Sequence, residues 1–392
     1  MRNSIKVNST LFYLVIFFLF VGEFKIFIGD SSISIPIGFP FILLIFFLQI
    51  SRSNISITID SVILVAVFIL GLFTVLLSDI NQIPRAIAAM IPLAVCIVTL
   101  LSTGKLSIDI EKAYKAFAYG GSILAIWVYF GFFQSLSIDG GYYEKKILIE
   151  TYLGRSNYLA AFLFFLAAIF LNKNKILFLF FVGAIFATMS RGGIIVTSLF
   201  ILQSIWINKR YKWIKFPIVV CAILLFVYFF ITNDLHQLLL NGDSFKVPDS
   251  FENRILLWNF SFDLLRNSPL FGVGPNGFRT AVEAAGNVED VWGAHNSILL
   301  LWLNYGITGL LLYLTYLHHI YIELKKATSE TIFRSIKTAF VFLLIFSLFE
   351  PLVGSVSFDL LLTLIFVMAK NFNRGNRKIP EYTMNVKSNI VY

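Results

Sequence analysis

Charged residues are scarce in this sequence. Asp, Glu, Lys and Arg make up 14% of its 392 residues, whereas an average soluble domain carries about 25%. Hydrophobic residues reach 58%, and phenylalanine alone contributes 43 residues. Even a large soluble fold exposes about a quarter of its chain's surface to water, so it could not hide this much apolar surface. The composition excludes an ordinary cytosolic enzyme, a disordered protein and a collagen-like scaffold, and it indicates an integral membrane protein.

Cysteine and histidine are also rare, with two and four residues. Cys96 and Cys221 both lie inside apolar runs, so we interpret them as packing residues and not as a disulfide. His318 and His319 fall among basic residues and are interpreted as interfacial. The sequence contains no His-Glu-x-x-His, Cys-x-x-Cys or paired-carboxylate cluster. We therefore expect no protein-bound catalytic metal and no cofactor.

The apolar stretches are continuous and do not alternate at every second residue, which favours membrane helices over a transmembrane barrel. A membrane-spanning helix needs roughly 20 apolar residues. We predict an all-α integral membrane protein, with residues 1–392 forming a single polytopic domain of twelve spans. The spans are expected near 11–28, 35–50, 61–77, 84–101, 113–133, 156–171, 176–190, 192–207, 216–232, 296–317, 338–350 and 355–369. The first of them is interpreted as an uncleaved span because no small-residue cleavage site follows it.

Basic residues follow one side of these spans. The termini and the loops on their side hold 21 of the 31 Lys and Arg residues. By the positive-inside rule, both termini are cytoplasmic. Residues 233–295, between the ninth and tenth spans, then form a large periplasmic loop. Because the net charge of +9 follows the membrane segments, we expect membrane lipids and no nucleic acid among the partners.

Within the loop at 233–295, the sequence predicts a helix followed by a turn. The sequence predicts a helix from about residue 249 that ends before Pro269 and, with few polar faces, lies at the bilayer interface. Next comes Gly272-Val-Gly-Pro-Asn-Gly277, which fits the G-x-G-x-x-G pattern. A dinucleotide site needs a preceding strand and a following helix, and neither is predicted here. We interpret the string as a tight turn in which Gly and Asn supply positive φ.

Two residues at the external membrane boundary need an explanation. Arg191 stands between two apolar runs, where a charge is expensive. It is either a snorkelling interfacial residue or, with the amides of Gly192 and Gly193 at a helix start, part of an anion-binding site. His295 precedes Asn296 at the start of a span. It is either a capping or packing residue or a general base, with Asn296 orienting its ring within the substrate site.

Three groups of motifs resemble the O-antigen ligase-like family of bacterial surface-polysaccharide enzymes, which also includes O-antigen polymerases. The resemblance lies mostly over 180–312, and the N-terminal spans match only in hydropathy. It depends on the order of the motifs around a large external loop. They are Ser190-Arg-Gly-Gly193; Glu252-Asn-Arg254 with Trp258, Pro269-Leu-Phe-Gly-Val-Gly274 and Asn276-Gly-Phe278; and His295-Asn296 with Leu299, Leu303-Asn-Tyr-Gly306 and Gly309-Leu310.

The resemblance implies a metal-independent glycosyltransferase in the bacterial inner membrane, with its active site at the periplasmic face. Its donor is a glycan on undecaprenyl pyrophosphate. Carried onto this sequence, Arg191 and Arg254 match the arginines that hold the pyrophosphate, and His295 matches the histidine that activates the acceptor hydroxyl. Direct displacement would invert the anomeric centre. Asn304 departs from the family, because many members have Glu at this position.

Several functions remain open at this stage. A ligase would use a lipid A core sugar as acceptor, whereas a polymerase would use another lipid-linked repeat unit. The prominent His295-Asn296 motif favours the ligase. A flippase for lipid-linked sugars would place charges near the middle of its spans, but here the candidate charges gather at one face. A structural subunit would leave Arg191, Arg254 and His295 without a role.

Overall fold

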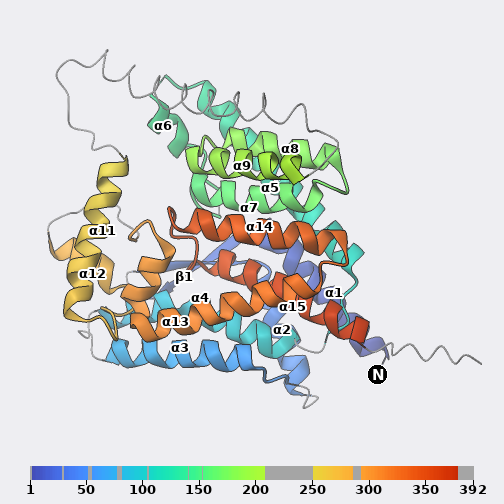
Figure 1. Cartoon of the computed structure of the whole chain (residues 1–392), viewed down its shortest axis with the longest axis horizontal. Helices are drawn as coiled ribbons and strands as arrows, with labels where there is room; N and C mark the ends of the chain where they lie inside the picture. Colours follow the sequence, from blue (N-terminus) through green and yellow to red (C-terminus); the bar gives the residue numbers. More distant parts are fainter. Residues whose placement is uncertain are drawn as a thin grey trace, which may run out of the picture.

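The computed structural model describes residues 2–28, 31–51, 55–76, 82–103, 106–139, 141–151, 153–207, 250–285 and 293–377. In these residues the chain is mostly helical, with one small sheet (Figure 1). The helices are α1 (Arg2–Leu19), α2 (Phe39–Ile50), α3 (Ile59–Leu76), α4 (Ile83–Thr103), α5 (Ile110–Leu136), α6 (Tyr142–Ile147), α7 (Ser156–Phe170), α8 (Lys175–Ala187), α9 (Arg191–Ile207), α11 (Ser250–Asn267), α12 (Gly277–Ala284), α13 (Ser297–Lys326), α14 (Thr331–Ser347) and α15 (Val356–Arg377). The strands are β1 (Glu23–Ile28) and β2 (Ser31–Pro36).

Five of the described helices are long and apolar enough to cross a membrane, namely α3, α4, α5, α13 and α15. Shorter apolar helices lie within α1, α2, α7, α8 and α9. The structure thus confirms a mainly α-helical membrane protein, and helices occupy most of the predicted spans. The count of twelve stays a prediction, because the expected span at 216–232 lies outside the described residues.

The prediction of one continuous span at 11–28 is wrong. Helix α1 ends at Leu19, and Glu23–Ile28 instead forms β1, which pairs antiparallel with β2. The second predicted span, at 35–50, is correspondingly shortened to α2. The physical reason is visible in the sequence: serine and isoleucine alternate through β2, which is the period of a strand. The high overall hydropathy concealed this alternation.

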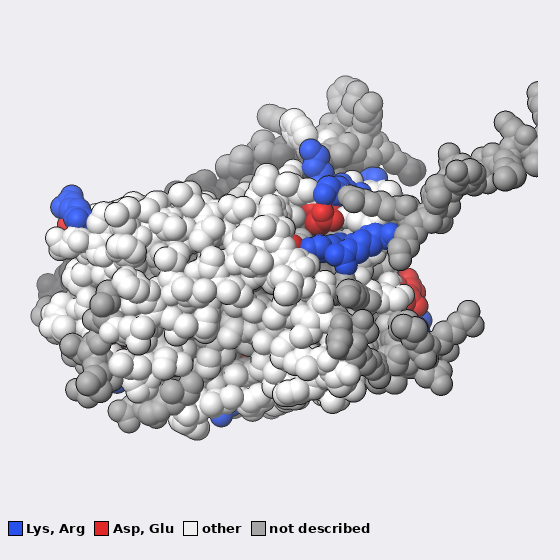
Figure 2. All heavy atoms as spheres, turned by 90° about the horizontal axis from the view of Figure 1, so that it is seen from below, with Lys and Arg blue, Asp and Glu red and all other residues white. Residues whose placement is uncertain are grey.

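The helices lie side by side along the long axis of the molecule, in the order α8, α7, α14, α13 and α3 from one side to the other (Figure 1). Helix α15 packs against α4 and α13. It is the central helix, since 83% of its apolar stretch is buried inside the protein, compared with 39% for that of α3. Seen from below, the molecule carries a broad band of uncharged side chains, with Lys and Arg gathered toward one end (Figure 2). Such a band suits a surface that faces lipid.

Helices α6, α11 and α12 lie at the end of the molecule opposite the N-terminus (Figure 1). As predicted, α11 ends before Pro269, and the following glycine-rich string is a turn with positive φ at Gly272 (70°), Gly274 (85°) and Asn276 (65°). This turn fits into a kink of α13, where Gly306 has a φ of 68°. The backbone amides of Val273 and Gly274 both donate to the carbonyl of Leu303.

Gly306 is the residue that makes this docking possible. A Cβ atom at this position would lie 1.8 Å from the carbonyl oxygen of Leu270. Only glycine combines the left-handed φ with so close a backbone approach. The freed amide of Ile307 finds a new partner in the carbonyl of Pro269. The 268–277 turn and the first half of α13 are therefore held in one fixed arrangement next to the site described below.

Candidate active site

Glu350 is the centre of a cluster of polar side chains at the same end of the molecule. It follows α14 in the segment that leads to α15, and its side chain is only 6% exposed. Its Oε1 accepts hydrogen bonds from Nη2 of Arg254 at 2.5 Å and from Nδ2 of Asn157 at 2.6 Å. Its Oε2 lies 3.7 Å from Nδ1 of His295. One buried carboxylate thus joins α7, α11 and the residues before α13.

The segment that carries Glu350 is fixed from three helices. The hydroxyl of Ser297 in α13 donates to the carbonyl of Glu350 and accepts from the amide of Val353, both at 3.1 Å. The hydroxyl of Tyr158 in α7 donates to the carbonyl of Pro351 at 2.5 Å. In α15, the carboxylate of Asp359 accepts from the amide of Gly354. Held by helices instead of by a free loop, Glu350 can fix the geometry of its partners.

His295 lies next to this carboxylate in a strained backbone conformation, with a φ of 47°. Its Nδ1 faces Glu350, but 3.7 Å is too long for a hydrogen bond. The contact is therefore electrostatic and strengthens when the ring is protonated. Nε2 is the nitrogen left to meet a substrate hydroxyl. The carbonyl of the preceding Ala294 accepts a hydrogen bond from Nε1 of Trp258, which ties this segment to α11.

The capping role belongs to Asn296 and not to His295. The Oδ1 atom of Asn296 accepts from the amide of Leu299 at 3.0 Å, as an N-cap of α13. The sequence-based alternative that His295 caps the helix is therefore wrong. The expectation that Asn296 orients the imidazole ring gains no support, because its side-chain oxygen is engaged by the backbone. Direct substrate contact by Asn296 stays a prediction.

Arg191 begins α9, as the sequence predicts, and its neighbours connect it to the cluster. The hydroxyl of Ser190 donates to Oδ1 of Asn157 at 2.7 Å, and Asn157 in turn donates to Glu350. The same serine oxygen accepts from the amide of Gly193 at 3.1 Å. That amide is thus already used within the turn.

The two glycines after Arg191 allow close helix packing. A Cβ atom on Gly192 would lie 2.7 Å from the ring of Phe346 in α14, and one on Gly193 would lie 2.4 Å from Cβ of Ala160 in α7. Glycines at such positions let membrane helices approach closely. The structure therefore gives Gly192 and Gly193 a packing role, and their predicted contact with substrate stays a prediction.

Lys146 in α6 is a member of the cluster that the sequence analysis missed. Burial lowers its pKa, the charge of Glu350 raises it, and the charges of Arg191 and Arg254 lower it further. These influences put Lys146 within electrostatic reach of all three groups. In the sequence it is one of two adjacent lysines in an external loop, which usually indicates a solvated pair. Only the fold brings it within electrostatic reach of the two predicted arginines.

Glu350 was also missed. It stood at the end of the predicted span at 338–350, and the signal was an acid followed by proline at the external end of an apolar run. Burial of its carboxyl raises the pKa, but His295, Arg254 and Asn157 outweigh burial and hold the pKa below its ordinary value. Glu350 is therefore ionised at neutral pH and can stabilise a protonated His295.

Among the described residues of this cluster, Arg191, Arg254 and Lys146 are basic and Glu350 is acidic. This excess of basic side chains favours an anion. In the described part of the chain, no group of three His, Cys, Asp or Glu side chains is arranged to hold a metal ion. Metal independence stays a prediction.

No curated protein matches the chain significantly. Residues 176–314 match the family model described as O-antigen ligase. The matched region includes Arg191, Arg254 and His295, whereas Lys146 and Glu350 lie outside it. The match confirms the resemblance that the motifs indicated, to the O-antigen ligase-like family of membrane enzymes of the glycosyltransferase type.

Proposed function

We propose that the chain transfers an O-antigen polysaccharide from undecaprenyl pyrophosphate to an acceptor sugar hydroxyl at the periplasmic face of the bacterial inner membrane. The observation that carries the proposal is the buried carboxylate of Glu350, which is bonded to Arg254 and faces His295. Arg191 and Lys146 lie near enough to influence this group electrostatically. The N-terminus lies at the opposite end of the molecule (Figure 1). This placement agrees with cytoplasmic termini and a periplasmic site.

On the donor side, the bond between the anomeric carbon and the pyrophosphate oxygen breaks, and negative charge builds on the leaving pyrophosphate. Arg254 is the best placed cation, because its bond to Glu350 holds the guanidinium in position and leaves other N–H groups to donate. Arg191 and Lys146 add charge from two further helices. Fixed cations in a site that excludes water stabilise such a leaving group effectively.

On the acceptor side, Nε2 of His295 takes the proton of the attacking hydroxyl as the new bond to the anomeric carbon forms. The resulting imidazolium faces the ionised Glu350 at 3.7 Å and is stabilised by it. Attack from the face opposite the leaving pyrophosphate inverts the anomeric centre. The acceptor proton is thus removed on one side of the sugar ring, and the pyrophosphate leaves on the other. The first event needs a base and the second needs cations, so one site contains both.

An apolar groove of about 410 Å³ between α13 and α14 suits the lipid part of the donor. At one end it is lined by Ser297 and Val353, which also hold the Glu350 segment. Toward the other end it is lined by His318 and Tyr321. Because Ser297 and Val353 border both the groove and the Glu350 segment, we propose that one ligand places its pyrophosphate at Arg254 and its prenyl chain in the groove.

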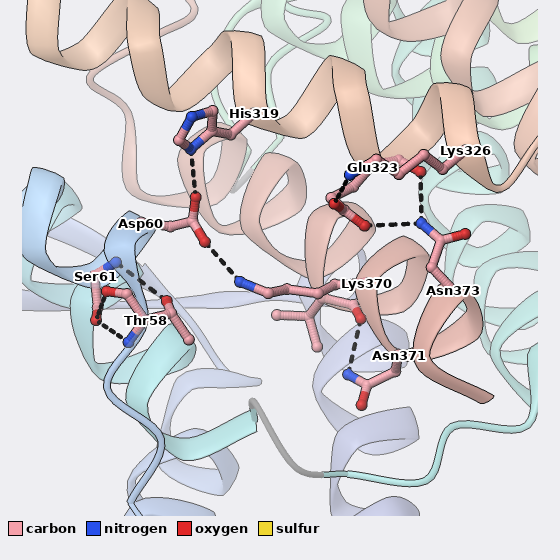
Figure 3. Close-up of polar contacts among 10 residues, drawn as sticks. Thr58, Asp60, Ser61, His319, Glu323, Lys326, Lys370, Asn371 and Asn373 are labelled. Carbon is pink, nitrogen blue, oxygen red and sulfur yellow. Dashed lines mark hydrogen bonds and ion pairs between the residues drawn. The ribbon is translucent and has the colours of Figure 1, made fainter. Parts of the chain in front are cut away.

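A flippase for lipid-linked sugars is the alternative from another class. A buried carboxylate also occurs in the first turn of α3, where Asp60 lies between the partly exposed side chains of His319 in α13 and Lys370 in α15 (Figure 3). Its two carboxylate oxygens lie 2.8 Å from Nδ1 of His319 and 2.6 Å from Nζ of Lys370. Because these side chains bond to one another across three helices, we interpret them as holding the helices together and not as lining a route for a substrate. His319, which the sequence analysis interprets as interfacial, belongs to this group of paired side chains.

Deleting the gene and separating the lipopolysaccharide on a gel tests the proposal. Loss of all long chains, with lipid-linked polymer accumulating, identifies a ligase. A core that carries only one repeat unit identifies a polymerase. An unchanged pattern of surface polysaccharide would contradict both. We favour the ligase on the basis of the prominent His295-Asn296 motif.

A further inference from the structure

A second cavity, of about 130 Å³, lies beside the charged cluster, between the 272–277 turn, α4 and α13. In comparable measures, one water molecule needs about 10–15 Å³, so the space is several times larger than one water. The side chains that give its walls their chemistry are Ala89, Asn276, Phe278, Arg279, Asn304 and Tyr305. None of them has a role in the transfer step described above.

The cavity borders the two segments that carry the reacting groups. Gly293, two residues before His295, and Gly354, four residues after Glu350, both line it. A ligand in this space would therefore contact the two segments that carry the base and its carboxylate. The kinked first half of α13 supplies Asn304 from the other side.

Two amide side chains in the cavity wall are incompletely paired. Nδ2 of Asn276 and Oδ1 of Asn304 are buried atoms without a hydrogen-bond partner. Asn304 is a buried residue, with 9% of its surface exposed. Native proteins rarely leave such atoms unpaired, and each one destabilises the fold unless something binds it. One amide offers a donor and the other an acceptor, which matches a ligand whose hydroxyls do both.

The remaining walls favour a neutral ligand. Phe278 and Tyr305 supply aromatic surface, and no lysine, aspartate or glutamate lines this cavity in the described residues. Its one charged side chain, Arg279, already donates to Glu283 at 2.9 Å. This chemistry differs from that of the cationic cluster at Glu350, which suits pyrophosphate. Aromatic surface with a few placed amides suits a sugar ring, which has apolar C–H faces and a rim of hydroxyls.

We propose that this cavity is a subsite for one neutral sugar ring whose hydroxyls pair with Asn276 and Asn304. The inference rests on the proposed function, and it assigns to these two residues the recognition of the sugar next to the bond that forms. The ring belongs either to the donor glycan or to the acceptor, because both present the same hydroxyl chemistry to the site.

Steady-state kinetics with two variants test the subsite. Asn304→Leu removes the amide at similar volume, and Asn276→Gly removes the other amide while keeping the positive φ of 65°. Each should lower kcat/KM roughly tenfold, as expected for one buried neutral hydrogen bond, while the thermal midpoint changes little. A change in KM confined to donor or to acceptor identifies which sugar occupies the cavity. The control, Asn172→Leu, removes an amide bonded to Ser335 far from the site and should leave both constants unchanged.

A binding measurement separates this inference from the proposed function. Saturation-transfer NMR on the purified chain would use D-glucose and N-acetyl-D-glucosamine as neutral probes, with D-glucuronate as the charged comparison. The subsite predicts transfer to a neutral probe that falls several-fold in the Asn276→Gly, Asn304→Leu double variant. Equal signals in both proteins, or none from either neutral probe, would overturn it, as would variants that lose only thermal stability. Sugar binding without glycan transfer would leave the subsite standing and refute the function.

Discussion

Replacing Glu350 by glutamine removes one negative charge and almost no volume. Glutamine still accepts the hydrogen bonds of Arg254 and Asn157, so the segment keeps its shape. What disappears is the ionic part of the contacts with Arg254 at 2.5 Å and His295 at 3.7 Å. We therefore expect Glu350→Gln to fold and insert normally but to transfer glycan slowly.

The size of the loss follows from these distances. A unit charge about 4 Å from another contributes about 4 kcal/mol at an effective dielectric constant of about 20. His295 is 39% exposed, so solvent reduces this to about 2 kcal/mol of imidazolium stabilisation. That corresponds to a fall in kcat of about 30-fold. Stability should fall by about 1–3 kcal/mol, because the partly exposed Arg254 loses its counter-charge.

The assay measures transfer in vitro from purified lipid-linked donor, with wild type and variant at matched protein amounts, together with thermal unfolding. Glu111→Gln is the control, because Glu111 forms an exposed ion pair with Lys173 far from the site, and such pairs contribute little. Because the pKa of Glu350 is lowered, its stabilising effect is present above the ordinary carboxyl pKa of about 4.3. The stability gap between wild type and variant should therefore shrink as pH falls below that value. Wild-type turnover in Glu350→Gln would refute the role assigned to this carboxylate.

Arg254→Lys and Arg191→Lys should insert normally but lose most activity, because lysine lacks the planar guanidinium that binds two phosphate oxygens. Full activity in both variants would indicate that the two arginines are merely interfacial residues. His295→Gln should lose about 10²–10⁴-fold in transfer rate, because glutamine cannot take a proton; a wild-type rate would exclude proton abstraction by this residue. Gly306→Ala should lower protein yield and thermal stability, since the new Cβ would lie 1.8 Å from a carbonyl oxygen. The control, Gly375→Ala, should be tolerated, because no atom lies within 4 Å of the new Cβ.

The local pattern of the sequence was enough to predict several elements of this fold. The helices at α3, α4, α5, α7, α8 and α9 follow from continuous apolar runs. The end of α11 before Pro269 and the positive φ values of the glycine-rich turn follow from the chemistry of proline, glycine and asparagine. Arg191 and His295 could be singled out because charged or titratable groups at a membrane boundary are costly, whereas Arg254 was singled out by the family resemblance.

The β1–β2 hairpin shows where this reasoning was insufficient. Its alternation has a period of two, but the segment is also apolar enough to resemble part of a membrane helix. Hydropathy averaged over a window cannot separate the two. Contacts of β2 with α4 and α15 accompany the hairpin in the fold, and such contacts join residues far apart in the chain, which a local pattern does not contain.

The amino-acid sequence by itself determined the class of the molecule, because its scarcity of charge and its long apolar runs leave a membrane protein as the only stable solution. It also marked Arg191 and His295 as residues at the predicted membrane boundary that need an explanation. Tertiary structure alone decided that Glu350 joins Arg254 and His295, that Lys146 comes within reach of both arginines, and that Asn296, not His295, caps α13. Glu350 lies 96 residues from Arg254 along the chain. The electrostatic energy of such a pair depends on distance and burial in space, and neither can be read from the order of residues.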